Sequence, residues 1–306
     1  MTNPSRSIAG NIRTRASLAI ILGAGVWGLF WIPLRHLANY GFDGLWAVAA
    51  TLGVPVVIGA PFFARKILHE FRLGYALLGI AIGLSVVFYF GGVIFSDVVR
   101  VISLFYMLPI WTTLLGRLFL GEKIGPRKLL AIGLALIGLY LMLGGLKDGP
   151  GLPIPSNLGD WFGLIAGFFW ACTLVIVRFN PEVDPVLNTT APFVFGFPIA
   201  VIGAFLLMTF APEFGAAPPG IDGLISGLLF AGLFGLLVLG PSVYLQVWGA
   251  RFLASSTAAL LTMVELLAAT FSATLLIGTS LQGIELVGCG IILIAVLLDL
   301  TAPVTD

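Results

Sequence analysis

The sequence predicts an all-α integral membrane protein with ten transmembrane helices, arranged as two inverted five-helix repeats. Three observations lead to this prediction: a shortage of charged residues, a series of long apolar segments, and a residue pattern that recurs halfway along the chain. Of the 306 residues, 59% are hydrophobic and 9% are charged. Soluble domains average about 45–50% apolar and about 25% charged residues, so these few charges cannot cover a water-exposed surface.

Apolar segments of transmembrane length follow one another along the chain. A bilayer core about 30 Å thick requires roughly 20 helical residues to cross it. The segments lack the strict alternation of apolar and polar residues that is typical of transmembrane β-barrels. The predicted spans are residues 17–36, 44–64, 73–95, 97–117, 129–146, 159–177, 185–209, 223–248, 252–277 and 280–298.

The polar segments between these spans divide the chain into two halves. Residues 1–16 form an N-terminal segment, and the apolar run that follows is long enough to be an uncleaved first helix rather than a signal peptide. A linker rich in Pro and Gly, residues 147–158, separates the first half, 17–146, from the second half, 159–298. Residues 299–306 form a short C-terminal tail.

The distribution of Lys and Arg predicts the orientation of the chain. With the N-terminus inside, 12 of the 15 basic residues fall in cytoplasmic segments. The other three, Arg35, Arg100 and Lys147, fall on the opposite side. Because cytoplasmic loops of membrane proteins carry an excess of positive charge, the N-terminal segment and the C-terminal tail are both predicted to be cytoplasmic.

Corresponding residues recur at a nearly constant offset. Trp27 and Arg35 have counterparts in Trp170 and Arg178, each 143 positions later. The offset then grows, through a modest insertion, to 155 and 156 in the pairs Tyr89 with Tyr244 and Met107 with Met263. Five spans in each half force the second copy to enter the membrane upside down. Inverted repeats of this kind are common in transporters, which hold their substrate near the midplane between the halves.

Two segments resemble a known family. The first is "WGLFW" at 27–31, and the second is residues 103–143, with a proline in the fourth span, "LGE" at its end and a glycine-rich fifth span. These segments resemble the drug/metabolite transporter superfamily, in its EamA-type branch of ten-helix exporters. Within that branch, the sequence is most similar to exporters of aromatic amino acids. The second copy matches less well, because it has Glu265 opposite Pro109 and "IGTS" in place of "LGEK".

Aromatic residues in the predicted spans are candidate substrate contacts. Trp and Tyr usually concentrate at membrane interfaces, whereas the candidate aromatic residues lie at more central depths of their spans. The resemblance implies that spans 1, 3, 4, 6, 8 and 9 surround a central cavity, in which rings would stack on apolar groups or hold cations. Any single ring could instead pack helices together or face lipid. The candidates are Trp27, Trp31, Tyr89, Tyr106, Trp111, Trp170 and Tyr244.

Two charged residues inside the spans are further candidates. Glu265 lies near the middle of the ninth span, where a carboxylate is expensive and usually faces a bundle interior or water. It could relay a proton, meet a substrate ammonium, or serve as a protonated structural residue. Arg100 lies a few residues inside the fourth span, where it could contact a substrate carboxylate or extend outward to the interface.

These features favour a secondary-active or facilitative exporter of small organic metabolites that works by alternating access. Amino acids with aromatic or apolar side chains are the preferred substrates, and export of aromatic, drug-like cations is the alternative. An intramembrane enzyme or a lipid scramblase is disfavoured, because neither a nucleophile–base pair nor a polar groove is evident. We expect no cofactor, no metal and no nucleic-acid partner, and we expect contact with membrane lipid. Because one chain holds both repeats, a monomer is sufficient. The expected location is the bacterial inner membrane.

Overall fold

The computed structural model describes residues 4–69, 71–96, 98–142, 154–180, 184–277 and 283–301. All regular secondary structure in these described segments is helical. Helices suit apolar segments because every interior backbone amide and carbonyl is bonded within the segment, without water. The elements are α1 (Pro4–Trp27), α2 (Trp31–Ala38), α3 (Leu45–His69), α4 (Leu73–Phe95), α5 (Val98–Phe105), α6 (Leu108–Phe119), α7 (Pro126–Met142), α8 (Leu158–Phe179), α9 (Pro185–Phe210), α10 (Leu224–Phe234), the π-helix η1 (Gly235–Leu239), α11 (Gly240–Ala250), α12 (Ser255–Thr262), α13 (Val264–Ile277) and α14 (Gly283–Leu300).

The helices agree with most of the predicted spans. In the described part of the chain, nine helical segments are long and apolar enough to cross a membrane. The remaining predicted span, 129–146, corresponds to α7, whose 17 residues are one fewer than the 18 of the shortest of the nine. Residues 143–153 lie outside the described residues, and so does most of the predicted linker. A tenth span therefore stays a prediction.

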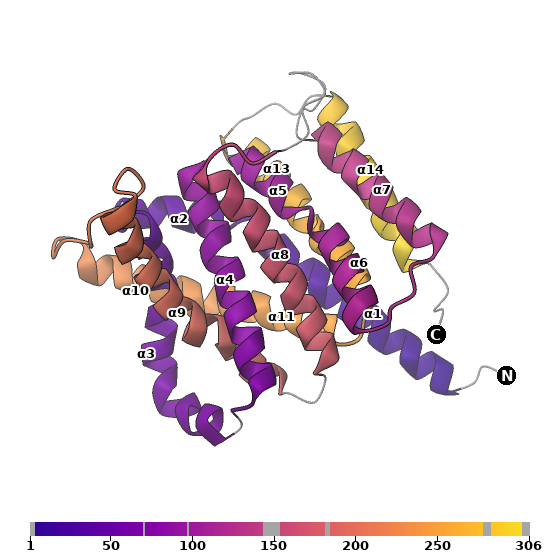
Figure 1. Ribbon diagram of the computed structural model, residues 1–306, viewed down its shortest axis with the longest axis horizontal. Coiled ribbons are helices and arrows are strands. Elements are labelled where there is room, and N and C mark those ends of the chain that lie inside the picture. Colours follow the sequence, from indigo (N-terminus) through magenta and orange to yellow (C-terminus); the bar gives the residue numbers. More distant parts are fainter. Residues whose placement is uncertain are drawn as a thin grey trace.

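Helices from the two halves pack against each other in exchanged pairs. Helix α4 of the first half packs along α8 of the second half. In the same way, α11, the counterpart of α4, packs along α1, the counterpart of α8. The pairs α3 with α9 and α7 with α14 each join two counterparts directly. Figure 1 shows α7 and α14 side by side at one edge of the bundle. An inverted repeat requires this exchange of partners. Its boundaries and the location of the termini stay predictions.

Four of the predicted spans are interrupted. The first breaks between α1 and α2, and the fourth breaks between α5 and α6. Pro33 and Pro109 follow these two breaks. A proline ring clashes with the carbonyl four residues earlier and supplies no N–H, and α5 ends at Phe105, four residues before Pro109. The eighth span contains η1, in which the Gly240 amide bonds the Gly235 carbonyl.

The ninth span breaks without a proline. Helix α12 ends at Thr262 and α13 begins at Val264, so Met263 alone separates the two. A tight turn forms here, in which the Leu266 amide bonds the Met263 carbonyl. Met107, the predicted counterpart of Met263, lies in the break between α5 and α6. The two halves therefore break at corresponding positions, one with a proline and one without.

Glycines allow close contact at these irregular points. A Cβ on Gly167 would lie 2.3 Å from the Phe105 carbonyl oxygen, the group that Pro109 leaves without its usual helical donor. A Cβ on Gly28, in the break between α1 and α2, would lie 2.4 Å from the Glu265 carbonyl oxygen. Small residues at helix contacts of this kind let backbones approach closely within a membrane.

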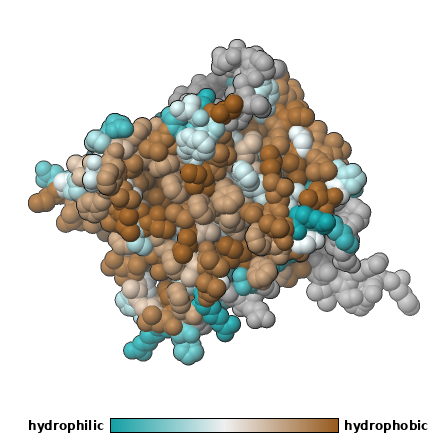
Figure 2. All heavy atoms as spheres, in the orientation of Figure 1, coloured by the Kyte–Doolittle hydropathy of each residue, from teal (hydrophilic) through white to brown (hydrophobic). Residues whose placement is uncertain are grey.

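The surface has the apolar character of a lipid-facing protein. Large hydrophobic side chains on α9 are exposed, with Phe210 at 79% and Ile202 at 58%. Figure 2 shows hydrophobic residues over most of the visible face, with hydrophilic residues toward its edges. Such a surface is suited to acyl chains and would be unfavourable in water.

Ion pairs connect helix ends and loops. Each joins two residues that the predicted topology places on the same side of the membrane. On the predicted cytoplasmic side they are Lys66 with Asp184, Arg178 with Glu122 and Lys128 with Asp299, and on the opposite side Arg100 with Asp160. The relative sidedness of these segments is consistent with the predicted topology, and the absolute orientation stays a prediction.

Candidate transport site

The breaks in the fourth and ninth spans meet inside the bundle. Helix α6 packs against α12, and the Tyr106 hydroxyl donates a hydrogen bond of 3.3 Å to the Thr262 carbonyl. Tyr106 is fully buried, and Thr262 is the last residue of α12. A side chain from one interrupted helix thus bonds the backbone at the end of the other. The sequence placed Tyr106 near this depth but did not reveal its partner.

Glu265 lies in the first turn of α13, directly after the break. Its Oε1 accepts a hydrogen bond of 2.7 Å from the Tyr89 hydroxyl of α4, and the residue is only 4% exposed. The start of a helix carries partial positive charge, which stabilises a nearby carboxylate. The break therefore creates a location inside the membrane where a carboxylate is less costly than in the middle of a helix.

Aromatic rings from both halves surround this region. The rings of Trp27 and Trp170 have centroids 5.9 Å apart, and Trp27 also contacts Tyr89 at 6.2 Å and Phe90 at 6.0 Å. We call Trp27, Tyr89, Phe90 and Trp170 the central aromatic cluster. Because Tyr89 belongs to it and bonds Glu265, the cluster and the carboxylate form one continuous buried site.

The two indole N–H groups of this cluster have no hydrogen-bond partner among the described residues. Trp27 is 7% exposed and Trp170 is 3% exposed. Leaving a buried donor unpaired costs roughly 1–3 kcal/mol. Most buried polar groups in proteins are paired, so the two donors are an unusual feature of the site.

Other sequence candidates lie elsewhere. Trp111, whose indole N–H also lacks a partner among the described residues, contacts Phe168 edge-on and lines a separate apolar pocket with it. Tyr244 lines a separate pocket of about 750 Å³ between α3, α9 and α11. The side chain of Trp31 lies outside the described residues. The structure therefore brings Trp27, Tyr89, Tyr106, Trp170 and Glu265 together and separates Trp111 and Tyr244 from them.

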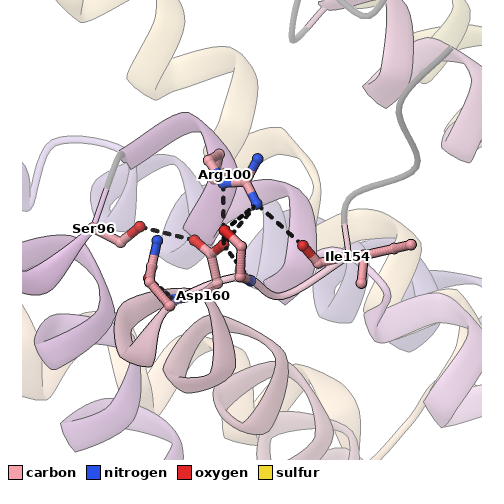
Figure 3. A network of polar contacts seen from close by, with 6 residues as sticks. Ser96, Arg100, Ile154 and Asp160 are labelled. Atoms are coloured by element: carbon pink, nitrogen blue, oxygen red, sulfur yellow. Dashed lines mark hydrogen bonds and ion pairs between the residues drawn. The ribbon is translucent and has the colours of Figure 1, made fainter.

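Arg100 is engaged in a polar network on the predicted outer side (Figure 3). Its Nη2 lies 2.7 Å from Oδ2 of Asp160, which is completely buried, and 3.1 Å from the Ile154 carbonyl oxygen. The Ser96 hydroxyl donates to the other Asp160 oxygen at 2.8 Å. The network ties the α4–α5 connection to the start of α8. Sequence reasoning overlooked Asp160, although its position just inside the sixth span made it a natural partner for Arg100.

Comparison with known proteins identifies the family. The profile of the EamA-like transporter family matches residues 14–144 and 157–301. The chain belongs to the EamA-like transporter family. An uncharacterized transporter of Archaeoglobus fulgidus is 26% identical over 282 residues, which cover 92% of this chain and 94% of the relative. The uncharacterized transporter YoaV of Bacillus subtilis is 23% identical over 215 residues, 67% of this chain and 69% of the relative.

The fold of this EamA-like transporter also resembles a solved crystal structure. The two superpose with a TM-score of 0.66 at 18% identity, covering 93% of this chain and 95% of the other. This likeness shows the fold alone. Family membership and the transporter relatives show a multi-pass membrane transporter rather than an enzyme.

In this EamA-like transporter, the "LGE" segment at the end of α6 contributes a second polar connection. Glu122 accepts hydrogen bonds from the Ser255 amide at 2.9 Å and the Ser255 hydroxyl at 3.0 Å, so it caps α12 from the connection between α6 and α7. The Arg178 Nε lies 3.4 Å from the same carboxylate. The capping role was not evident from the sequence, because residue 122 and residue 255 are far apart in the chain.

Proposed function

We propose that this protein exports small organic metabolites, and that its substrates are amino acids with aromatic or apolar side chains. The observation that carries the proposal is the buried apposition of the central aromatic cluster with Glu265, between two interrupted helices. Aromatic rings favour flat or apolar side chains, and a carboxylate favours the α-ammonium group common to amino acids. Broken helices near the midplane are typical substrate sites of secondary transporters.

The proposed mechanism is alternating access, in which the two halves move against each other around the site. Polar links on both sides of the bundle would have to break and form in turn. The Arg100–Asp160 network joins elements on the predicted outer side, and the Glu122–Ser255 contact joins elements on the predicted cytoplasmic side. Opening one side would break its link while the other stays closed.

Two modes of transport are compatible with this mechanism, and they differ in the source of energy. In the coupled mode, Glu265 exchanges a proton for the substrate ammonium, so proton entry drives export. In the facilitative mode, the substrate moves down its own gradient and Glu265 contributes only to binding. An imposed pH gradient distinguishes them, since only the coupled mode responds to it.

Counterflow in proteoliposomes tests the proposed substrate class. Purified protein in vesicles loaded with unlabelled phenylalanine should accumulate external radiolabelled phenylalanine, and protein-free vesicles should not. The same vesicles should exchange phenylalanine faster than glutamate, because a second negative charge is unfavourable beside Glu265. Absence of exchange with every aromatic and apolar amino acid would contradict the proposal.

Export of aromatic cations is the second candidate function. The same buried carboxylate among aromatic rings favours it, because rings attract cations over their faces. A drug-like amine that exchanges as well as phenylalanine would support this second function. For either substrate, we propose that the protein acts in the bacterial plasma membrane and that one chain suffices.

A further inference from the structure

We infer that the indole N–H groups of Trp27 and Trp170 bind the carboxylate of the transported molecule, so that the site selects zwitterions over amines. This inference rests on the proposed function, since it specifies how an amino acid would lie in the same site. The observation behind it is a pair of buried donors without partners among the described residues, contributed by α1 and α8.

The two indole rings are close enough to contact one ligand. Trp27 and Trp170 have ring centroids 5.9 Å apart with planes inclined at 48°, so they are neighbours and not parallel. They are also predicted counterparts in the two repeats. Two such donors on either side of a pseudo-two-fold axis suit an acceptor that has two equivalent oxygens, as a carboxylate has.

The stacked ring of Phe90 does not take the place of that acceptor for Trp27. An indole N–H points along the plane of its own ring, and the Phe90 ring is stacked on Trp27 with planes only 14° apart. The Trp27 N–H therefore runs alongside the Phe90 face rather than into it. The indole donors differ in this respect from the Tyr89 hydroxyl, which already donates to Glu265.

The position of Glu265 gives the ligand its direction. Tyr89 contacts the Trp27 ring with its own ring and donates its hydroxyl to Glu265, so this tyrosine connects the Trp27 indole to the carboxylate. An α-amino acid carries its ammonium and its carboxylate on the same carbon, Cα. It can therefore direct the ammonium toward Glu265 and the carboxylate toward the indoles, with its side chain against the cluster.

Selectivity follows from the pairing of these groups. A site built to hydrogen-bond a ligand rejects an analogue that lacks the bonded group, because its own buried groups are then left unpaired. An amine without a carboxylate would leave both indoles unpaired, and an acid without an ammonium would face Glu265 with a like charge. Both analogues should bind at least about tenfold more weakly than the amino acid.

Competition in wild-type proteoliposomes tests the inference without any substitution. Radiolabelled phenylalanine exchange is measured in the presence of unlabelled phenylalanine, of phenethylamine, which lacks the carboxylate, or of 3-phenylpropionate, which lacks the ammonium. We expect phenylalanine to inhibit at roughly tenfold lower concentration than either analogue. Equal inhibition by phenethylamine would overturn the inference while leaving phenylalanine exchange, and so the proposed function, intact.

Substitution of single indoles tests the assignment to these residues. Trp27→Phe and Trp170→Phe each keep a ring and remove an N–H. Each should reduce the preference for phenylalanine over phenethylamine severalfold. Trp111→Phe is the matched control, since the Trp111 N–H is also buried without a partner among the described residues, while its ring lies against Phe168, away from the cluster. An unchanged preference in both cluster variants, or an equal loss in Trp111→Phe, would overturn the assignment.

Discussion

The breaks at Met107 and Met263 occupy corresponding positions in the two halves but have different chemistry. At the first, Pro109 follows the break and removes an N–H from the helix. At the second, Glu265 stands in the position of that proline and places a carboxylate inside the membrane. Backbone irregularity is thus common to both halves, whereas the charged group is present in only one. The comparison teaches that two halves can share a backbone irregularity while a single carboxylate makes the site polar on one side.

The two breaks also depend on each other. Tyr106, beside the first break, bonds the Thr262 carbonyl at the second. Tyr89, also from the first half, bonds Glu265. The first half therefore supplies two hydroxyl donors to the second break, one to the Thr262 carbonyl and one to the Glu265 carboxylate. A change at either break should affect the site at the other.

The largest expected effect is on coupling to protons. Glu265→Gln keeps the shape and one acceptor oxygen but cannot bind and release a proton. If transport is coupled through this residue, the variant should still exchange phenylalanine while losing all acceleration by an imposed pH gradient. Proteoliposome flux with and without the gradient measures this. A full response in the variant would show that Glu265 is not the coupling group, and no response in wild type would establish the facilitative mode.

The second largest effect is on stability, at the glycines that face the breaks. Gly28→Ala and Gly167→Ala should each lower stability by about 1–3 kcal/mol, because the new methyl group would overlap a carbonyl oxygen. The two variants should lose similar amounts of stability if the scaffold is symmetrical. Thermal unfolding of purified protein measures the effect. Gly133→Ala in α7 is the control, since no described atom beyond its chain neighbours and its own helix backbone lies within 4 Å of its Cβ position. Equal stability of all three variants would refute the close packing.

A moderate effect is expected from removing single rings of the site. Trp170→Ala and Tyr106→Ala should each weaken transport roughly two- to twelvefold. This range corresponds to the loss of one aromatic contact, which contributes about 0.5–1.5 kcal/mol. Exchange rates should be normalised to folded protein measured by size-exclusion chromatography, because both side chains are buried. Normal exchange per folded molecule in both variants would mean that these rings only pack the helices.

The smallest effect concerns an ion pair far from the breaks. Lys66 hydrogen-bonds Asp184 and holds the pKa of that carboxyl below its ordinary value. A lowered folded-state pKa stabilises the protein above the unfolded pKa of about 3.9, and this contribution is lost as pH falls through the folded-state pKa. At the start of α9, Asp184 accepts a hydrogen bond from the Val186 amide, and the asparagine of Asp184→Asn can still accept it. Its melting temperature should therefore be slightly lower than wild type at pH 7, with the difference vanishing in strong acid.

Much of the architecture could be predicted from composition and periodicity. Long apolar segments predict spans because the bilayer imposes their length, and nine of them have described helices of suitable length. The helix interruptions were harder to predict. Pro109 marks one, but no residue type marks the break at Met263. The backbone there lies against Gly28, in the break between α1 and α2, and no local pattern shows this contact.

The candidate site could be predicted only in part. Trp27, Tyr89, Tyr106, Trp170 and Glu265 share a depth that the sequence indicates, and the structure brings them together. Trp111 has a similar depth but belongs to the face of α6 directed toward Phe168. Depth follows from position along a span, whereas the direction of a side chain depends on how each helix is rotated in the bundle.

The central claim is that Glu265 forms the polar contact with the transported molecule. Calorimetric titration of purified protein with phenylalanine tests it most directly, using wild type, Glu265→Gln and the control Glu285→Gln, which changes the carboxylate in the first turn of α14. A hydrogen bond to a charged group is stronger than one to a neutral group by about 1–1.5 kcal/mol. The account predicts a Kd raised roughly tenfold in Glu265→Gln and unchanged in Glu285→Gln. An unchanged Kd in Glu265→Gln would contradict it.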